Sequence, residues 1–454
     1  MKPLQVDLDL IRKYNVPAPR YTSYPPATCF TKISANDVDE CLRADSQSNR
    51  DLSLYFHLPF CPSLCWFCGC TTVITTKTEE IGRYLDYLNR ELASVAKTLN
   101  PSRKVAQLHF GGGTPTYLKP DQIRWLGKRI REHFTFADDI EAGVEIDPRR
   151  VVRDHITALR ESGFNRASLG VQDFDPAVQK AIHRIQSKEE TTQTVEWLRE
   201  EGFTSINLDL IYGLPHQTVH SFEHTLDQVL ELKPDRLAVF NYAHVPWAKP
   251  AQNILKELPT PEVKLDMLKH TIEHLTSRGY VYIGMDHFAL ANDELAVAQQ
   301  NKTLQRNFQG YSTRGETDIY AFGMSSISQT RDAYWQNDKD LLQYYDAIDS
   351  NRSPISRGYV LNNDDKIRRH VIMRLMCDMS MDYASLSKIA GINFTEYFAD
   401  ELASLSDLEA DGLIITHPHG LTVTELGRLL IRNIASRFDA YNSKRQESVF
   451  SRSI

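Results

Sequence analysis

The amino-acid sequence predicts an α/β fold, in which a partial or full (β/α) barrel is followed by a mainly helical, winged-helix-like C-terminal domain. Two observations carry this prediction. Between residues 51 and 358, short β-rich runs alternate with charged segments of helical spacing, which is typical of parallel strands joined by helices. After about Tyr359 the alternation gives way to amphipathic helical patterns. The predicted divisions are an N-terminal segment (1–50), the barrel with its extension (51–358) and the C-terminal domain (359–454).

Strand and helix candidates alternate through the predicted barrel. In such a barrel the chemistry lies on loops at the C-terminal ends of the strands, so residues that follow a strand are the first candidates for a site. The predicted helices include Arg83–Leu99, Asp121–His133 and Thr191–Gly202. The predicted strands are Leu52–His57, Val105–Phe110, Gly143–Ile146, Arg166–Val171, Ser205–Leu210, Arg236–Phe240 and Tyr280–Gly284.

The C-terminal domain is predicted from two helical faces, a hairpin and a closing helix over Leu426–Tyr441. The hairpin turns at His417-Pro418-His419-Gly420. No dense basic stripe accompanies these elements in the sequence, which favours a packing or lid domain over a nucleic-acid module. The two faces are marked by Ile367, Val371, Ile372, Leu375 and Met376 and by Phe394, Phe398, Leu402 and Leu405.

Composition narrows the class of protein. The chain has 454 residues, of which 41% are hydrophobic and 24% charged, as in a globular protein with more than one domain. The net charge of −7 argues against a nucleic-acid partner. The N-terminus lacks the pattern of a secretory signal, and no apolar run approaches the roughly 20 residues that span a bilayer. We therefore expect a cytoplasmic protein without a membrane partner.

Cysteine usage gives the sharpest signal. Four of the seven cysteines are Cys61, Cys65, Cys68 and Cys70, directly after the first predicted strand. The first three have the spacing C-x3-C-x2-C, so that three thiolates on one loop can hold three corners of a cubane iron–sulfur cluster. The fourth iron is then open to a ligand, as catalytic metal sites require. A structural zinc site is the alternative, but it normally uses four ligands, and no second Cys/His pair with suitable spacing follows.

Other candidates follow later strands. Gly111-Gly112-Gly113-Thr114 comes after Phe110, where glycines let backbone N–H groups approach a ligand, although a plain tight turn has the same pattern. Glu145, Gln172 and Asp209 each lie at the end of a predicted strand. A single polar residue at such a position more often forms hydrogen bonds within the protein than to a ligand. Three of them at equivalent positions of the barrel favour a ligand-binding site. Arg184, on the helical stretch Pro176–Gln186, fits a surface charge as well as a pocket.

These motifs together resemble the radical S-adenosylmethionine (SAM) superfamily and, within it, the oxygen-independent coproporphyrinogen III oxidase family. The resemblance runs almost end to end. Its motifs are the cysteine loop with Cys68-Gly69-Cys70, the glycine loop, Pro19-Arg20-Tyr21-Thr22-Ser23-Tyr24-Pro25, Gly170-Val171-Gln172-Asp173-Phe174, Asp209-Leu210-Ile211-Tyr212-Gly213-Leu214-Pro215, Phe240-Asn241-Tyr242-Ala243-His244, Gly284-Met285-Asp286-His287-Phe288-Ala289 and Asn307-Phe308-Gln309-Gly310-Tyr311.

The resemblance implies a [4Fe–4S] cluster on Cys61, Cys65 and Cys68 and, as in the family, two SAM molecules. Ile327 is carried over only by its surroundings, Gly323–Ser328, and Gln309 is a weaker further candidate. The residues that the resemblance assigns to SAM are Tyr55, Phe67, Gly112, Gly113, Thr114, Glu145, Gln172, Arg184, Asp209, Ala243 and Ile327.

The resemblance also implies the reaction. An electron from the cluster cleaves SAM to methionine and a 5′-deoxyadenosyl radical, which takes hydrogen from a propionate side chain of coproporphyrinogen III. Loss of carbon dioxide and of one more electron leaves a vinyl group, and a second round gives protoporphyrinogen IX for heme synthesis. An electron donor and an electron acceptor, both unidentified, are required, and the family match favours a monomer.

A substrate with several carboxylates needs basic anchors, and Arg20 is the candidate. A salt bridge that pins its loop is an equally good interpretation, and the N-terminal segment could form a substrate lid. Two stretches depart from the family pattern, His183–Ile185 and Val245–Pro250, and we expect them to touch none of the cysteines. The role of Cys70 stays open. The rival functions are a related heme chaperone and a non-catalytic zinc or nucleic-acid module.

Overall fold

The computed structural model describes residues 7–442, which fall into two compact units. Unit 1 contains Met1–Cys29, Thr260–Gly315 and Leu361–Ile454, and unit 2 contains Phe30–Pro259 and Glu316–Val360. The outer ends of the predicted N-terminal segment and C-terminal domain, residues 1–6 and 443–454, lie outside the described residues.

Unit 2 is organised around a series of parallel strands in the order β14-β2-β5-β6-β7-β8-β9. Beyond β14 the sheet continues through antiparallel neighbours in the order β15-β16-β17-β1, so the parallel series forms a partial barrel. The strands are β1 (Thr31–Lys32), β2 (Leu52–Leu58), β5 (Lys104–Gly112), β6 (Thr135–Ile146), β7 (Arg166–Gln172), β8 (Ser205–Tyr212), β9 (Arg236–Asn241), β14 (Asp318–Phe322), β15 (Ile327–Gln329), β16 (Ala333–Asn337) and β17 (Ile355–Val360).

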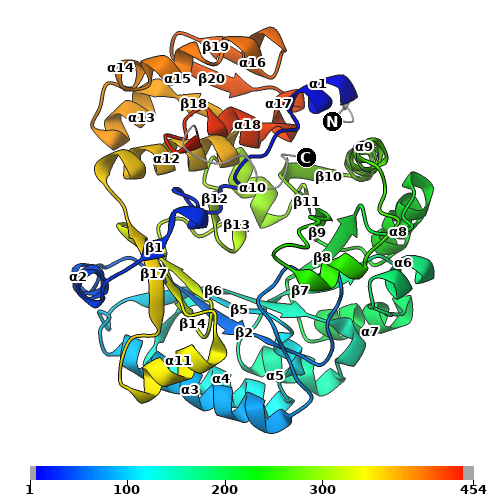
Figure 1. Cartoon of the computed structure of the whole chain (residues 1–454), viewed down its shortest axis with the longest axis vertical. Helices are drawn as coiled ribbons and strands as arrows, with labels where there is room; N and C mark the ends of the chain where they lie inside the picture. Colours follow the sequence, from blue (N-terminus) through cyan, green and yellow to red (C-terminus); the bar gives the residue numbers. More distant parts are fainter. Residues whose placement is uncertain (1–6, 443–454) are drawn as a thin grey trace. The chain divides into compact units, whose positions relative to one another are not determined.

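Helices between these strands lie along the outer side of the sheet (Figure 1). In α3 (Thr78–Ala96) Ile81, Tyr84, Leu85 and Leu88 are buried at helical spacing, which gives the helix one apolar face. Strand β2 is buried along nearly its whole length, as expected for a parallel strand covered on both faces. The other helices of unit 2 are α2 (Ala35–Asp45), α4 (Pro120–His133), α5 (Arg153–Glu161), α6 (Pro176–Ala181), α7 (Lys188–Glu200), α8 (Val219–Glu231) and α11 (Leu341–Asp349).

Two details of the predicted barrel were wrong. The predicted strand Tyr280–Gly284 exists as β10, but it forms an antiparallel pair with β11 (His287–Leu290) in unit 1 instead of extending the parallel series. The predicted helical stretch Pro176–Gln186 ends at Ala181, because Ile182 leaves helical geometry and His183 adopts a positive φ of 55°. Arg184 therefore lies on a loop. Strand β14, parallel to β2, was not predicted.

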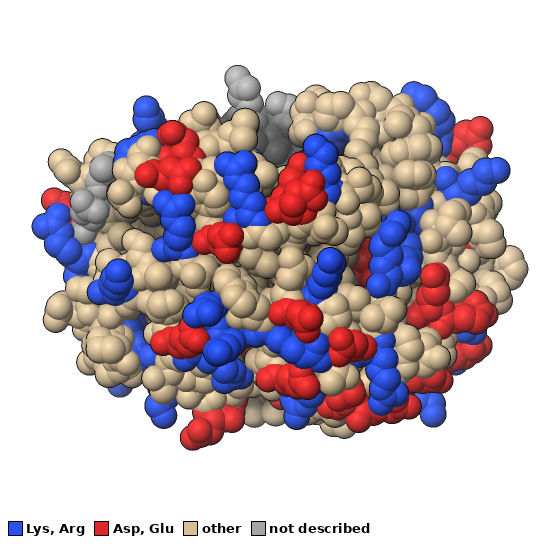
Figure 2. All heavy atoms as spheres, turned by 90° about the horizontal axis from the view of Figure 1, so that it is seen from below, with Lys and Arg blue, Asp and Glu red and all other residues tan. Residues whose placement is uncertain are grey.

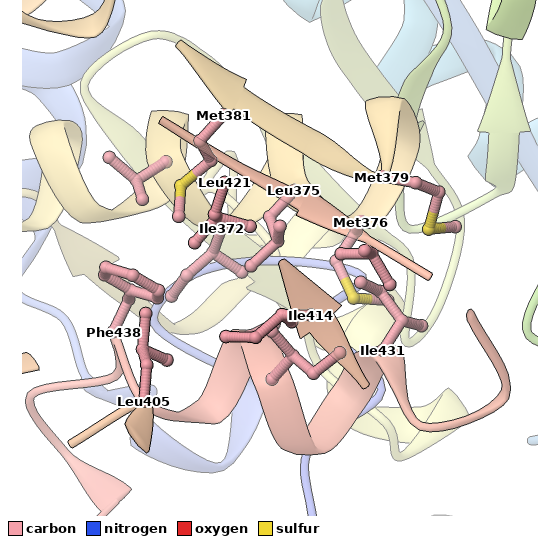
Figure 3. Close-up of a cluster of buried hydrophobic side chains, with 14 of the residues drawn as sticks. Ile372, Leu375, Met376, Met379, Met381, Leu405, Ile414, Leu421, Ile431 and Phe438 are labelled. Carbon is pink, nitrogen blue, oxygen red and sulfur yellow. The ribbon is translucent and has the colours of Figure 1, made fainter. Parts of the chain in front are cut away.

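Unit 1 has its own hydrophobic core, between α12 (Asn363–Asp378) and the elements that follow it (Figure 3). Ile372, Leu375 and Met376 of α12 pack there with Ile431 and Phe438. The predicted hairpin is confirmed as β19 (Ile414–His417) paired with β20 (Gly420–Val423), and β18 (Ser380–Asp382) completes a small sheet. Unit 1 also contains α1 (Leu8–Tyr14), α9 (Pro261–Ser277), α10 (Glu294–Gln300), β12 (Gln305–Asn307), β13 (Gly310–Ser312), α13 (Tyr383–Ala390) and α16 (Ser406–Ala410).

The predicted continuous helices of this part of the chain are broken. The closing helix is two short helices, α17 (Glu425–Leu429) and α18 (Ile431–Ser436), because Leu430 has a φ of −108° and a ψ of 21°, outside the helical range. The helix expected through Phe394 and Leu405 is likewise interrupted at Phe398, between α14 (Phe394–Tyr397) and α15 (Ala399–Ala403).

The surface carries charges of both signs. On the face shown in Figure 2, basic and acidic side chains are interspersed. In unit 2, for example, Arg124 forms ion pairs with Asp154 at 2.5 Å and with Glu161 at 2.5 Å. None of the helices in the described part of the chain combines the length and the apolar character needed to cross a bilayer.

Candidate functional site

The loop that carries the cysteines leaves the C-terminal end of β2 and is held by backbone contacts within unit 2. The Trp66 N–H donates to the carbonyl of Ile182 at 3.0 Å, and the Gln252 amide donates to the carbonyl of Phe67 at 3.0 Å. His183 Nδ1 lies 2.9 Å from the carbonyl oxygen of Leu64, and its ring stacks on Trp66. The loop is therefore held in one conformation by residues that are far away in the sequence.

The sulfur atoms have polar and cationic surroundings. Cys61 Sγ lies 3.3 Å from Thr114 Oγ1 in the glycine loop. Cys65 Sγ lies 3.7 Å from a guanidinium nitrogen of Arg149 and 3.7 Å from one of Arg184. Burial raises the pKa of Cys61 to about 11. The pKa of Cys68 is lowered, first by a hydrogen bond from the Cys70 thiol and, more weakly, by Lys249 and Arg184.

This donor set fits an iron–sulfur cluster. Clusters bind anionic sulfur, and the guanidinium groups of Arg149 and Arg184 place positive charge within 3.7 Å of Cys65 Sγ. Among the described residues no three His, Cys, Asp or Glu side chains surround a point that would hold a single metal ion. The assignment of Cys61, Cys65 and Cys68 as ligands therefore rests on their spacing and on the chemistry of their surroundings.

Both stretches that depart from the family pattern do touch the cysteine loop, so the expectation that they would not was wrong. Arg184 contacts Cys65, and Lys249 Nζ donates to the carbonyl of Cys70 at 2.7 Å. Arg184 also donates to the carbonyl of Gly170 at 2.7 Å and pairs with Asp147 at 3.2 Å. Asp147 and Arg149 complete this network and were not identified from the sequence, although they follow directly on β6 and Glu145.

The glycine loop follows β5 and packs against the start of the cysteine loop. Gly113 N–H donates to the carbonyl of Leu58 at 2.9 Å, and Thr114 N–H donates to that of Phe60 at 3.0 Å. A Cβ at Gly113 would lie 2.4 Å from the carbonyl oxygen of Pro59. Only glycine allows this close approach, so the glycines couple the two loops.

Glu145, in β6, is bound on two sides. The N–H of Gly112 donates to Glu145 Oε2 at 3.0 Å, and His109 Nε2 lies 3.5 Å from Glu145 Oε1. Burial alone would raise the pKa of this carboxyl, but His109 and the Gly112 N–H outweigh burial and hold it below its ordinary value. Glu145 is therefore an anionic acceptor within the loop system, suited to hydroxyl or ammonium groups.

Asp209, in β8, is held by neutral groups. Ser168 Oγ donates to its Oδ2 at 2.8 Å, and Asn207 donates to its Oδ1 at 2.7 Å. Burial raises the pKa of Asp209 to about 7, and the nearby Glu145 charge acts in the same direction. A proton on Asp209 is thus retained close to neutral pH.

The raised pKa of Asp209 predicts a pH-dependent stability for the protein without SAM. The folded state binds the Asp209 proton more tightly than the unfolded state does. The free energy of unfolding therefore falls as the pH rises from 3.8 towards about 7, and this contribution is constant above that pH. Its slope is at most about 1.4 kcal/mol per pH unit. In urea unfolding at pH 5 and pH 8, Asp209→Asn should gain stability relative to the unmodified protein as the pH rises. An equal difference at the two pH values would contradict this prediction.

The structure places the other sequence candidates as follows. Tyr55 (β2) has its hydroxyl 3.2 Å from His57 Nδ1, and Phe67 packs against the cluster of buried residues that contains Val178 and Ile182. Gln172 ends β7 with a φ of 68°, Ala243 is exposed just after β9, and Ile327 begins β15. The residues that the resemblance assigns to SAM all lie in unit 2, whereas the further candidate Gln309 does not. Arg20 and Gln309 lie in unit 1, where Arg20 pairs with Asp286, as the salt-bridge interpretation predicts.

The chain matches two protein-family models. Residues 55–229 match the radical SAM superfamily, and residues 361–430 match the HemN C-terminal domain. The first match contains the C-terminal part of β2, the cysteine loop and the strands β5, β6, β7 and β8.

Relatives are similar over nearly their whole length. A protein of Synechocystis named oxygen-independent coproporphyrinogen III oxidase is 46% identical over 99% of this chain and 98% of its own length. The protein of that name in Escherichia coli is 49% identical over 99% of this chain and 98% of its own length. A solved structure of coproporphyrinogen III oxidase (HemN) from Escherichia coli, described as a radical SAM enzyme, superimposes with a TM-score of 0.93 at 47% identity. It covers 97% of this chain and 100% of that one.

Proposed function

The chain belongs to the oxygen-independent coproporphyrinogen III oxidase family of radical SAM enzymes, and we propose that it converts two propionate side chains of coproporphyrinogen III into the vinyl groups of protoporphyrinogen IX. The superfamily uses a [4Fe–4S] cluster and SAM, and this chain is one of its members. The observation that carries the proposal is the cysteine loop at the end of β2, joined to the glycine loop by the contact between Cys61 and Thr114.

The residues of unit 2 have separable roles in this proposal. Cys61, Cys65 and Cys68 hold the cluster, and Arg149 and Arg184 stabilise the charge on Cys65. Gly112, Gly113 and Thr114 offer a backbone surface on which SAM can lie closely, and Glu145 and Asp209 accept hydrogen bonds from it. Tyr55, Phe67, Gln172, Arg184, Ala243 and Ile327 complete the SAM contacts that we propose.

When bound, the cluster and SAM supply a 5′-deoxyadenosyl radical able to take hydrogen from an unactivated carbon. The balance for each propionate is one hydrogen atom to that radical, one carbon dioxide released and one electron to an acceptor. The reaction therefore needs a one-electron donor for the cluster and a separate one-electron acceptor. Free cysteines throughout the described residues suit a reducing compartment, and we propose a cytoplasmic monomer.

Anaerobic turnover tests the proposal directly. Reconstituted protein is given SAM, a low-potential reductant, an electron acceptor and coproporphyrinogen III. We expect protoporphyrinogen IX, two molecules of carbon dioxide per product and 5′-deoxyadenosine, measured by chromatography. A protein that contains the cluster and cleaves SAM but binds heme without altering coproporphyrinogen III would instead be a heme chaperone. Colourless protein that contains zinc in place of iron would reject both functions.

A further inference from the structure

Three arginines of unit 1 lie close together around one loop of the N-terminal segment. Arg20, Arg306 and Arg432 gather around the loop Ala18–Arg20, and Asp286 is the carboxylate that pairs with Arg20. We call Arg20, Arg306 and Arg432 the arginine cluster. Arg432 donates to the carbonyl oxygens of Ala18 and Pro19, and Arg306 Nη2 donates to that of Arg20 at 3.2 Å.

Two of the three guanidinium groups are withdrawn from water. Arg306 is 5% exposed and Arg432 is 4% exposed, whereas the Arg20 side chain is 39% exposed. Burial and, to a smaller extent, the charges of Arg20 and Arg306 lower the pKa of Arg432 to about 9, while Asp286 opposes them. Burying like charges together is costly unless counter-charges accompany them.

Arg306 shows where a counter-charge is missing. Its Nη1 is buried and has no hydrogen-bond partner among residues 7–442, and the described residues provide it with no carboxylate. Its contacts are the Arg20 carbonyl and the face of the Tyr311 ring, whose centroid lies 4.7 Å from Cζ. A planar guanidinium with a free donor edge is suited to a carboxylate, which it can bind through two parallel hydrogen bonds.

We propose that the arginine cluster binds the carboxylate of one of the substrate's propionate groups. The propionate concerned is one that does not react and is still present on the product. The inference deepens the proposed function and rests on it. Asp286 on Arg20 shows that this group of side chains already binds one carboxylate, and Arg306 Nη1 has no such partner among residues 7–442.

Chemistry selects a retained propionate over a reacting one. A reacting carboxylate leaves as neutral carbon dioxide, so an ion pair with it would be lost along the reaction. Such a pair would stabilise the ground state more than the transition state and would slow decarboxylation. A retained carboxylate keeps its charge throughout the reaction. Tight binding of this carboxylate by the arginine cluster therefore does not raise the barrier of any chemical step.

Binding of two stable porphyrins tests the proposal. Coproporphyrin III has four propionates, and protoporphyrin IX has only the two that are retained. In cluster-containing protein with SAM, Arg306→Gln should weaken binding of both porphyrins by about tenfold or more, the loss expected for a charged hydrogen bond. Arg306→Lys, which keeps the charge but not the planar fork, should lie between this variant and the unmodified protein. Binding is followed by porphyrin fluorescence, and iron content by metal analysis.

A matched control comes from the same unit. Arg374 donates to the carbonyls of Lys302 and Leu304 and pairs with Asp378, outside the arginine cluster. Arg374→Gln should leave porphyrin affinity within about twofold of the unmodified protein, well below the loss of a charged pair. If Arg306→Gln folds and binds both porphyrins as tightly as this control, the proposal is wrong. If only coproporphyrin III is bound more weakly, the carboxylate concerned is a reacting one, and the retained-propionate assignment fails.

Asp286→Asn separates a binding role from a purely structural one. If the arginine cluster binds substrate carboxylate, removal of the competing charge should tighten porphyrin binding about threefold or more. If the arginines only pin the loop, loss of the Arg20 pair should leave affinity unchanged or weaken it, which would overturn the proposal. Turnover by the unmodified protein reports separately on the proposed function, so failure of either can be distinguished.

Discussion

Replacement of Cys65 by serine should leave a folded protein that has lost its cluster and its ability to cleave SAM. A serine hydroxyl is a poor iron ligand beside thiolate, and two remaining cysteines cannot hold three corners of a cubane. The guanidinium groups of Arg149 and Arg184, 3.7 Å from Cys65 Sγ, would also lose their contact with sulfur. We expect iron below about one tenth of the unmodified content after anaerobic reconstitution and no detectable 5′-deoxyadenosine.

The control for this variant is Cys41→Ser. Cys41 lies in α2, is half-buried and is remote in sequence from the cysteine loop. Its replacement should leave iron content and SAM cleavage unchanged, while far-UV circular dichroism checks the fold of both variants. Normal SAM cleavage by Cys65→Ser would show that Cys65 is not a ligand. Loss of the cluster in both variants would show that the effect is not specific to the loop.

Parts of the site could be predicted from the sequence because short, local sequence motifs mark them. Three cysteines within eight positions must share one loop, whatever the rest of the chain does. Glu145 and Asp209 could be placed at one edge because parallel strands present their C-terminal ends on the same side of a sheet. The contacts of Arg149 with Cys65 and of Arg306 with the Arg20 loop depend on tertiary structure, and neither arginine has a distinguishing local pattern.

The errors in the fold have a related cause. Apolar spacing predicts a helix through Leu426–Tyr441, because it records which side chains are buried. It does not record that Leu430 leaves helical geometry within that buried segment. Likewise, the run Tyr280–Gly284 is correctly β-rich, but strand propensity does not specify whether its neighbour is parallel or antiparallel.

Gly112→Ala should strongly destabilise the glycine loop. Gly112 has a φ of 117°, which L-residues rarely adopt, and a Cβ there would lie 2.7 Å from the imidazole of His57. The strain and the overlap together should cost about 2–4 kcal/mol of unfolding free energy. Because the Gly112 N–H donates to Glu145, we also expect SAM to bind at least about tenfold more weakly.

Gly82→Ala is the matched control, because it adds the same methyl group at a position where we expect it to stabilise the protein. Gly82 lies inside α3, and an added Cβ there has no heavy atom within 4 Å. Alanine should stabilise the helix by about 0.5–1 kcal/mol and leave SAM affinity unchanged. Urea unfolding and equilibrium dialysis with SAM measure both quantities. If Gly112→Ala matched Gly82→Ala in stability and in SAM affinity, the loop would tolerate a side chain, and the close backbone approach that we assign to SAM binding would be wrong.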